Sequence, residues 1–491
     1  MHRRTFLSTA LGAGLTATAA LPATAAPPAT ALAATASPGT RTHTRPVRAR
    51  TLEELRQAIA AAHPGTEIVV ANGTYDVPGD ETIAIQGRRG SDGAPIVIRS
   101  ETVGGVTLTG NRGFVFGDSS YVTVSGFTLK QRTTFEVPTT CHHVTLSRND
   151  LQLADIEGMH WLMVRGDSTT VERNHFHGKS TLGIFLGVEG PGSDGMARGV
   201  RIVRNYFSDH TFAGDNGGEP IRLGLSGRSL SDAGALVEQN LFERANGDPE
   251  AISVKSSGNT IRQNTIRDSL GGIVLRHGNR SRIEANFILA GSNGIRIYGN
   301  DHLIVNNYTE QIGGSGIVLG SGNVRDHKPE DSPESRQGND APDRVTIGLN
   351  TVLACGTAIS GESQRTLPPL GCSITDNLLI GDSGKQLVSM PYLDGIAWSG
   401  NLCWGAAADG NIPADGFSRK DPKLAAGSDG IRRLTSSSPA INAASKSYPK
   451  VPKDLDGQPR TGTADVGADE YSTAPAINRP LTPSDVGPAS R

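Results

Sequence analysis

The sequence predicts an all-β protein, a single-stranded right-handed parallel β-helix (a solenoid) with an N-terminal capping helix. Three observations predict this fold. The chain of 491 residues contains 61 glycines and 5% aromatic residues, a composition that favours one elongated β structure over several globular domains. Short alternating strands recur along it, each followed by an asparagine. The best amphipathic helix precedes the first of these strands.

The N-terminus has the order of features found in twin-arginine export signals, and residues 1–36 are interpreted as a signal peptide of this type. Arg3 and Arg4 precede Phe6, Leu7, an apolar Ala/Leu/Gly stretch and small residues suited to a signal peptidase. The apolar stretch is too short for a good membrane anchor, and no other segment approaches a spanning length. We therefore expect a secreted protein without a membrane partner.

The rest of the chain is expected to divide into a linker, one long domain and a tail. The Ala/Pro/Thr-rich run over 37–50 is interpreted as a linker, 51–470 as the β-helix and 471–491 as a C-terminal tail. At the start of the domain, Thr51 and Glu54 form a capping box before an amphipathic helix, which a strand and a turn follow. This helix is expected to cover the open end of the solenoid.

Ten asparagines mark the repeat, each between a short alternating strand and another apolar residue, as in VRIVRNYF, NTIRQNTI and SRIEANFI. They are Asn149, Asn174, Asn205, Asn240, Asn264, Asn286, Asn307, Asn350, Asn377 and Asn401. Most intervals are 21 to 35 residues, which is the length of one β-helix coil with loop insertions. We expect each asparagine to adopt the left-handed conformation at a bend and to hydrogen-bond its counterpart in the next coil. A leucine-rich repeat would need a leucine framework that this chain lacks.

A second strand in each coil aligns by its apolar residues, as in GIFLG, PIRLG, AISVKS, GIVLRHG, GIRIYG and GIVLG. Pairs such as Ile252 and Val254 are expected to point inward, so period two turns the residues between and after them outward. One outward column is then Phe185, Arg222, Ser253, Val274, Arg296 and Val318, and the other is Gly187, Gly224, Lys255, Arg276, Tyr298 and Gly320. Lys255 and Arg276 are expected on neighbouring coils, about 4.8 Å apart.

Stacked cations on one sheet face repel, so stability alone gives no reason for Lys255 beside Arg276. Arg222, Arg296 and His277 add to the crowding. An ordinary solvated basic face is the alternative interpretation. The acids just before this strand make a functional site the more specific hypothesis.

Asn216, Asp248 and Glu250 supply hard oxygen ligands of the kind that Ca²⁺ accepts. Five residues separate Glu250 from Lys255, so simple alternation would place them on opposite faces. Pro249 removes this conflict if it places the acids at the bend rather than within the ladder.

The segments NGGE, DPEAISVKSSGNT and GGIVLRHGN together resemble polysaccharide lyase family 6, which contains alginate lyases and chondroitinase B, a dermatan sulfate lyase. The resemblance extends from about residue 51 to DLDGQPRTGTADVGADEY near the C-terminus. It implies that Lys255 is the Brønsted base and Arg276 the Brønsted acid. It also implies that Asn216, Asp248 and Glu250 bind calcium, although the family commonly has glutamate at position 248.

The expected activity is therefore calcium-assisted β-elimination on alginate, which leaves 4,5-unsaturated uronate ends. Removal of the C5 proton is feasible only if the adjacent carboxylate is neutralised, which calcium can do as a Lewis acid. Lys255 must be neutral to accept the proton, whereas Arg276 normally stays protonated and stabilises charge on the leaving oxygen. The residues expected to bind flanking sugars are Arg222, His277, Arg296 and Tyr298.

Three alternatives remain open from the sequence. Dermatan sulfate is the rival substrate, although no extra basic cluster answers its sulfates. A glycoside hydrolase would need paired carboxylates, and the outward columns of the central coils contain none. A non-catalytic polyanion-binding β-helix would need only the basic face. The formal net charge of −2 gives no support for nucleic acid as a partner.

Two further features carry weaker expectations. Four cysteines permit three complete pairings, and none has the spacing of a metal or redox site. The charged segment between Gly322 and Arg344 is expected either to close one end of the cleft or to be a disordered insertion.

Overall fold

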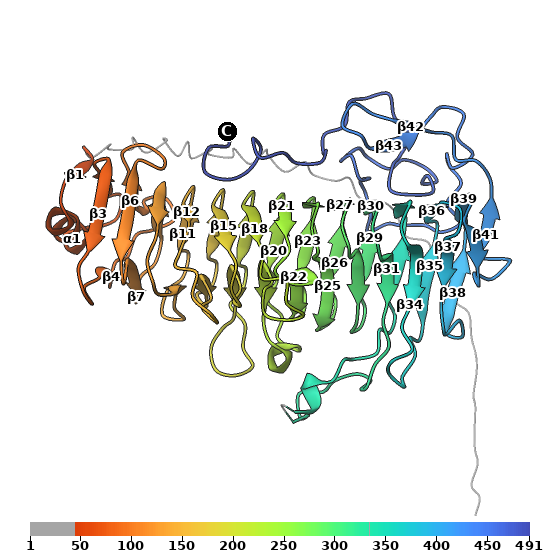
Figure 1. Ribbon diagram of the computed structural model, residues 1–491, viewed down its shortest axis with the longest axis horizontal. Helices are drawn as coiled ribbons and strands as arrows, with labels where there is room; N and C mark the ends of the chain where they lie inside the picture. The colour runs from red at the N-terminus through yellow and green to blue at the C-terminus, as the bar shows by residue number, and fades with distance from the viewer. Residues whose placement is uncertain (1–44, 333) are drawn as a thin grey trace, which may run out of the picture. The chain divides into compact units, whose positions relative to one another are not determined.

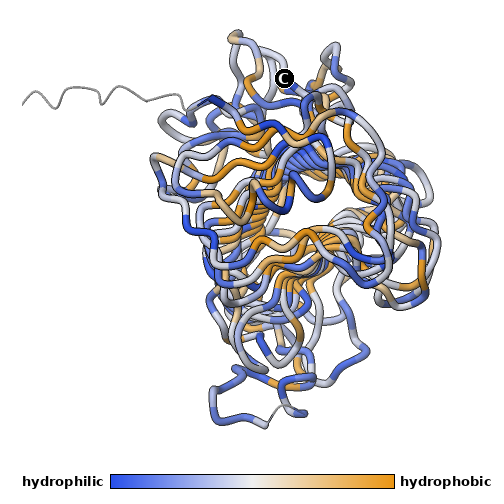
Figure 2. The backbone as a smooth tube through the Cα atoms, turned by 90° about the vertical axis from the view of Figure 1, so that its left-hand side faces the viewer, coloured by the Kyte–Doolittle hydropathy of each residue, from blue (hydrophilic) through white to orange (hydrophobic). Residues whose placement is uncertain are grey.

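The computed structural model describes residues 45–332 and 334–491, and three long parallel sheets dominate it (Figure 1). Each complete coil contributes one strand to each sheet, which is the architecture of a parallel β-helix and confirms the predicted fold. The predicted signal peptide lies outside the described residues. Figure 2 looks down the stack of coils and shows apolar residues concentrated in the stacked strands and hydrophilic residues in the outer loops.

Sheet 1 has 14 strands, namely β1 (Val47–Ala49), β2 (Glu67–Val70), β5 (Ile96–Ser100), β8 (Val122–Ser125), β11 (Thr145–Ser147), β14 (Thr170–Glu172), β17 (Arg201–Val203), β20 (Leu236–Glu238), β23 (Thr260–Arg262), β26 (Arg282–Glu284), β29 (Leu303–Val305), β32 (Thr346–Gly348), β35 (Cys372–Thr375) and β38 (Ile396–Ser399). Sheet 2 also has 14, namely β3 (Gly73–Val77), β6 (Val106–Gly110), β9 (Phe127–Leu129), β12 (Asp150–Leu151), β15 (His175–Lys179), β18 (Tyr206–His210), β21 (Leu241–Ala245), β24 (Thr265–Arg267), β27 (Phe287–Leu289), β30 (Tyr308–Glu310), β33 (Thr351–Leu353), β36 (Leu378–Gly381), β39 (Asn401–Gly405) and β41 (Phe417–Arg419). Sheet 3 has 11, namely β10 (Phe135–Val137), β13 (Leu162–Val164), β16 (Leu186–Val188), β19 (Ile221–Leu223), β22 (Glu250–Lys255), β25 (Gly272–His277), β28 (Ile295–Ile297), β31 (Ser315–Leu319), β34 (Thr357–Gly361), β37 (Gln386–Ser389) and β40 (Ala408–Gly410). Two small sheets pair β4 (Ile83–Gln86) with β7 (Phe114–Gly117) and β42 (Leu424–Ala426) with β43 (Arg432–Leu434).

The asparagine repeat forms a continuous hydrogen-bonded ladder at the corner between sheets 1 and 2. All ten side chains are at most 1% exposed. Asn240, for example, donates from Nδ2 to Oδ1 of Asn264 at 3.0 Å, and Asn264 donates in the same way to Asn286. The main-chain N–H of each ladder asparagine donates to the same oxygen as its side chain. The predicted contact between counterparts in successive coils is thereby confirmed.

The left-handed conformation at this corner belongs to the residue before each asparagine, so that part of the prediction was wrong. These preceding residues have φ between 53° and 66°, and they are Arg148, Arg173, Arg204, Gln239, Gln263, Ala285, Asn306, Leu349, Asp376 and Gly400. The physical reason is a division of roles. One residue turns the backbone, and the asparagine then directs its amide into the coil, where it satisfies buried main-chain groups.

The N-terminal helix α1 (Leu52–Ala60) covers the first coil as expected. Thr51 is its N-cap and accepts a hydrogen bond from the main-chain N–H of Glu54 at 3.1 Å. Leu55 and Ile59 are buried on the side that packs against β1, β2 and β4. The predicted linker ends too late, because Val47–Ala49 already forms strand β1 and pairs in parallel with β2.

The last 70 or so residues fold back over the outer face of sheet 2 instead of continuing the coils (Figure 1). Ile431, Leu455 and Ala468 pack on Phe287 and Tyr308 of β27 and β30. The predicted tail follows the same face. The main-chain N–H of Leu481 donates to Oγ1 of Thr265 at 2.9 Å, and that of Gly487 donates to the carbonyl of Arg204 at 3.0 Å.

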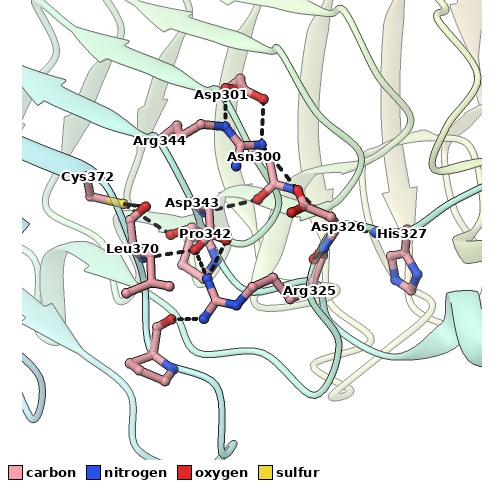
Figure 3. A network of polar contacts seen from close by, with 12 residues as sticks. Asn300, Asp301, Arg325, Asp326, His327, Pro342, Asp343, Arg344, Leu370 and Cys372 are labelled. Carbon is pink, nitrogen blue, oxygen red and sulfur yellow. Dashed lines mark hydrogen bonds and ion pairs between the residues drawn. The ribbon is translucent and has the colours of Figure 1, made fainter. Parts of the chain in front are cut away.

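The charged segment from Gly322 to Arg344 is held against the β-helix by a polar network (Figure 3). Arg344 contacts both carboxylate oxygens of Asp301, at 2.8 and 3.0 Å, and Arg325 pairs with Asp343. The segment includes the short helix η2 (Ser335–Gln337), where Arg336 donates to the carbonyl of Gly227 at 3.2 Å. Gly227 lies in a second short helix, η1 (Ser226–Arg228), so the two helices meet beside sheet 3.

The four cysteines are buried and unpaired, which leaves no disulfide in the described part of the chain. Among the described residues, no helix has both the length and the apolar character that a membrane crossing requires.

Candidate functional site

Sheet 3 carries the predicted site residues, and its strands align largely as the sequence predicts. Arg222 lies opposite Ser253, Val274 lies opposite Arg296, and the flanking apolar residues point into the core. The alignment is wrong at β16, where Leu186 rather than Ile184 pairs with Ile221. The buried Phe185 therefore packs on Trp161 inside the coil, and Gly187 takes its place beside Arg222.

Two compensating β-bulges lie between β22 and β25. Ala251 is an extra residue in β22, and Arg276 is an extra residue in β25, so that Lys255 lies opposite His277 instead of Arg276. The first bulge brings Glu250 to the same outer face as Lys255, although Glu250 lies within the ladder. The bulge, and not a bend at Pro249, therefore explains how Glu250 and Lys255 come to lie on the same face. Bulges of this kind redirect side chains and occur often beside functional sites.

Lys255 ends strand β22 and faces an acid that the sequence analysis did not single out. Its Nζ lies 3.3 Å from Oε1 of Glu219, and the lysine side chain is 12% exposed. Glu219 is 1% exposed, and its other oxygen, Oε2, has no hydrogen-bond partner. Glu219 precedes the core residues Ile221 and Leu223 at the same two-residue spacing. A glutamate in line with core residues was the feature of the sequence that could have identified it.

Asp248 and Glu250 are both buried close to Glu219. Asp248 accepts hydrogen bonds from the main-chain N–H groups of Glu250 and Gly218, at 2.9 and 3.4 Å. Burial raises the pKa of Asp248 to about 7, and the negative charges of Glu219 and Glu250 contribute. The site therefore concentrates negative charge more than it can neutralise without a proton or a cation.

Glu250 is already paired in this conformation. Its Oε1 accepts from Nη2 of Arg296 at 2.7 Å, and its Oε2 accepts from Oγ of Ser253 at 2.5 Å. Arg296 was predicted to bind sugar, yet here it neutralises a predicted metal ligand. Asn216 is exposed in the loop before β19.

Arg276 belongs to a cluster of three guanidinium groups around Tyr298. The guanidinium carbons of Arg276, Arg296 and Arg365 lie 5.8, 5.8 and 4.9 Å from the centre of the tyrosine ring. Such distances allow cation–π attraction. In the amide orientation that its neighbours require, Oδ1 of Asn339 accepts from Arg276 and Arg365, each at 3.1 Å.

Two residues predicted to bind sugars are buried. His277 is 2% exposed and shares a hydrogen bond of 3.0 Å between Nε2 and Oγ of Ser226. Burial, together with the charges of Arg276 and Lys255, lowers the pKa of His277 to about 3. Tyr298 is 1% exposed and donates from its hydroxyl to Glu362 at 2.7 Å. Both side chains support the cations in this conformation rather than presenting themselves to solvent.

Arg222 is also tied to an acid. Its side chain is 12% exposed and lies 3.7 Å from Glu189, which also contacts Arg165 and Arg228 at 3.2 and 3.8 Å. Sequence reasoning missed Glu219, Glu189, Asn339, Glu362 and Arg365. The last three lie outside the aligned strands, on segments that follow β31 or β34, and no spacing in the sequence links them to Arg276.

The donor set fits a bound cation. Oε2 of Glu219 is a buried oxygen without a partner, and Asp248 is crowded by two other carboxylates. Hard oxygen donors of this kind suit Ca²⁺. The acid side chains must move before they can share one ion. Glu250 is bound to Arg296, and the ligand atoms of the three acids do not all lie within 4.8 Å of one another in the described chain.

Comparison with known proteins gives one family and several similar structures. The chondroitinase B family matches residues 49–321, which is more than half of the chain. The structure of AlyGC, a family 6 alginate lyase, is 26% identical, with a TM-score of 0.72 over 90% of this chain and 58% of that chain. This chain thus spans a little over half the length of AlyGC. No curated protein matches.

Two further structures share the fold. A mannuronic acid specific polysaccharide family 6 lyase from human gut microbiota is 23% identical, with a TM-score of 0.67 over 75% of this chain and 89% of that chain. The family 6 polysaccharide lyase Pedsa3628 from Pseudopedobacter saltans is 24% identical, with a TM-score of 0.62 over 91% of this chain and 99% of that chain.

Proposed function

Because this chain belongs to the chondroitinase B family, polysaccharide lyase family 6, we propose that it cleaves alginate by calcium-assisted β-elimination and leaves 4,5-unsaturated uronate ends. The observation that carries the proposal is the position of Lys255 and Arg276 at the ends of two neighbouring strands, beside three buried acids. In this proposal, the amine and the guanidinium would flank the sugar that is cleaved, and a cation held by the acids would neutralise its carboxylate.

Lys255 is proposed to remove the C5 proton. In this conformation its Nζ is paired with Glu219 at 3.3 Å. When the Glu219 carboxylate turns to a cation instead, Lys255 loses this partner, and its amine becomes free to face the sugar. Lys255 is therefore expected to act as the base only in the loaded site.

Arg276 is proposed to stabilise negative charge on the leaving oxygen. The Tyr298 ring supports its guanidinium, and the Asn339 oxygen accepts one of its N–H groups. A guanidinium fixed in this way is a preorganised donor, which stabilises charge without having to reorient during the reaction. Because arginine gives up its proton with difficulty, proton delivery to the leaving group is the smaller part of its role.

Glu219, Asp248 and Glu250, with Asn216 at the rim, are the residues that would hold calcium. A bound Ca²⁺ would supply Lewis-acid neutralisation of the uronate carboxylate. Arg296, released from Glu250, would then be free to contact the polysaccharide. Arg222, on the neighbouring strand β19, is proposed to bind an adjacent sugar carboxylate.

Alginate is the favoured substrate because AlyGC, the structure with 26% identity, is an alginate lyase. Apart from Arg276, the arginines of the site, Arg222, Arg296 and Arg365, are paired with acids and so do not form an additional free basic cluster for sulfate. Dermatan sulfate is the second candidate, because the matching family carries the name of chondroitinase B. Secretion by the twin-arginine route is part of the same proposal and would bring the enzyme to an extracellular polysaccharide.

The test is product analysis. The purified chain, with calcium, is incubated separately with polymannuronate, polyguluronate and dermatan sulfate, and products are followed by the absorbance of the unsaturated uronate and by mass. We expect unsaturated oligosaccharides from one or both alginate polymers. Unsaturated products from dermatan sulfate alone would transfer the activity to that substrate. Saturated ends, or no cleavage of any polymer, would contradict a lyase.

A further inference from the structure

A second cluster of metal-ligating side chains lies on sheet 2, away from the cations and acids of sheet 3. It consists of Asp150 on β12 and His175 and His177 on β15. Asp150 and His175 are directly opposite each other in the parallel ladder. His177 follows His175 by two residues and therefore shares its face of the sheet. The cluster plays no part in the proposed elimination.

The three side chains converge. One ligand atom from each, a ring nitrogen or a carboxylate oxygen, lies within 4.8 Å of the others. Nε2 of His177 is 2.8 Å from Oδ1 of Asp150, and the two imidazole rings stack with their centres 4.0 Å apart. A tetrahedral zinc site needs bonds of about 2.0–2.1 Å, which places its ligand atoms about 3.3 Å apart. To reach that geometry, the two imidazole rings must turn out of their stack so that one nitrogen of each points at the ion.

Neighbouring residues hold two of the three ligands, Asp150 and His175, in place, as is usual at metal sites. Oδ2 of Asp150 accepts from Gln152 at 2.7 Å, and Nε2 of His175 contacts Oγ of Ser208 at 3.0 Å. The His175 ring also stacks on Tyr206, with the ring centres 4.4 Å apart and the planes at 7°. These contacts restrict the imidazole and the carboxylate before any ion arrives, which lowers the ordering cost of binding.

We propose that Asp150, His175 and His177 form a binding site for a divalent transition metal, with Zn²⁺ as the ion that the donor set suits best. Two imidazoles and one carboxylate are typical zinc ligands, whereas calcium prefers an all-oxygen set such as that on sheet 3. The side chains of His177 and Asp150 are 28% and 25% exposed, so an ion can enter and water can complete the coordination.

The position of the site gives it a structural role. It ties two successive coils together across β12 and β15, directly under the end of the chain that folds back over sheet 2. A side chain built on Gly487 would lie 4.0 Å from Cβ of His175. Arg148 and Arg173, at the corners just before these strands, hold the carbonyl groups of Ser490 and Arg491, each at 2.6 Å. Metal binding is therefore expected to stabilise the N-terminal coils and the overlying segment.

The test compares metal binding by the full chain with that of the double variant Asp150→Asn, His177→Gln, in saturating calcium so that the sheet 3 acids are occupied. The control is His63→Ala, an exposed histidine elsewhere. Titration with ZnCl₂ should give one site in the wild type and the control, and affinity at least tenfold weaker in the double variant. Co²⁺ should give the visible spectrum of a tetrahedral site in the wild type and the control, and not in the double variant.

Thermal unfolding separates binding from damage to the fold. Without zinc, the double variant should unfold within a few degrees of the wild type, because Asp150→Asn keeps the shape of the side chain and His177→Gln keeps a polar side chain at a partly exposed position. With zinc, the melting temperature should rise in the wild type and not in the double variant. Equal zinc affinity in the two proteins, or no zinc binding by the wild type, would overturn the proposal and leave only an ion pair between His177 and Asp150. Neither result depends on lyase activity.

Discussion

The asparagine corner and the cation-bearing face of sheet 3 belong to the same coils but obey different rules. At the corner, ten equivalent side chains repeat one arrangement, and each coil from Asn149 to Asn401 contributes the same amide to the same ladder. On sheet 3, neighbouring positions hold serine, valine, lysine or arginine, and the ladder is interrupted by bulges at Ala251 and Arg276. Regular repetition stabilises the solenoid, whereas the interrupted strands carry the groups proposed to act on a substrate.

This contrast has an electrostatic side. The ladder amides are neutral, and each has partners in the adjacent coils, as Asn264 does. The sheet 3 face instead buries Glu219 with one unpartnered oxygen and surrounds Tyr298 with three guanidinium groups. Buried charges without partners and crowded like charges lower the stability of the fold. They are tolerated at sites where a ligand can pair with them.

The largest effect is expected for Lys255→Ala. If Lys255 removes the C5 proton, kcat/KM on alginate should fall about 10²- to 10⁴-fold, the range usual for loss of a positioned general base. The initial rate of unsaturated product formation measures it. The matched control is Lys385→Ala, at an exposed turn. An intact rate in Lys255→Ala, with the control equally intact, would remove the proposed base.

Removing one asparagine from the corner ladder should lower the free energy of unfolding without changing the groups proposed to act on the substrate. Asn264→Ala removes a side chain that donates to Val237 and Asn286 and accepts twice from Asn240. Because buried groups in two adjacent coils lose partners, we expect a loss of about 2–4 kcal/mol in the free energy of unfolding, measured by urea denaturation.

Asn293→Ala is the control for this change. Its half-buried side chain makes one hydrogen bond, to the carbonyl of Leu270 at 2.8 Å, and its loss should cost only about 1 kcal/mol. Equal losses in the two variants would mean that the ladder acts as separate contacts and not as a connected network.

The buried acid gives a pH-dependent prediction. Because the pKa of Asp248 in the folded protein is about 7, above its ordinary value of 3.8, the folded state binds more protons than the unfolded state between those values. Without metal, stability from this group is therefore present at low pH and is lost as the pH rises toward 7. Asp248→Asn should flatten this decline and make the metal-free variant more stable than the wild type above pH 7, by about 1–3 kcal/mol.

Calcium reverses that order. It should stabilise the wild type most above pH 7, where Asp248 is ionised, and should stabilise Asp248→Asn less. Asp454 and Asp469, whose pKa values burial also raises, titrate in both proteins, so their contribution cancels in the comparison. Parallel stability curves for the two proteins from pH 4 to 8 would contradict the proposed charge on Asp248.

The sequence predicted the regular region better than the irregular one, for a physical reason. Periodic residues report on repetition, so the ten asparagines, their ladder and the pairing of the inward apolar residues from β19 to β31 could be predicted. A bulge inserts one residue without any change in composition, and so the shift that places Lys255 opposite His277 left no signal. The left-handed conformation of the residue before each asparagine could not be predicted either, because no single residue type marks that position. Arginine, glutamine, alanine and leucine all occupy it, because the ladder imposes the turn.

The smallest effect is expected at Asn339. This residue tests whether the charged segment, which no sequence repeat connects to the site, helps to position the site residues. Asn339, in the charged segment after β31, bridges Arg276 and Arg365. If it holds Arg276 in position for the leaving oxygen, Asn339→Ala should lower kcat about three- to tenfold and leave KM within twofold. Asn339→Asp keeps an oxygen that accepts from both guanidinium groups and should restore most of the rate. Asn323→Ala, an exposed asparagine of the same segment, should change neither constant. A rise in KM with unchanged kcat in Asn339→Ala would place the residue in substrate binding, and failure of the aspartate variant to restore the rate would show that the segment acts through its fold rather than through this oxygen.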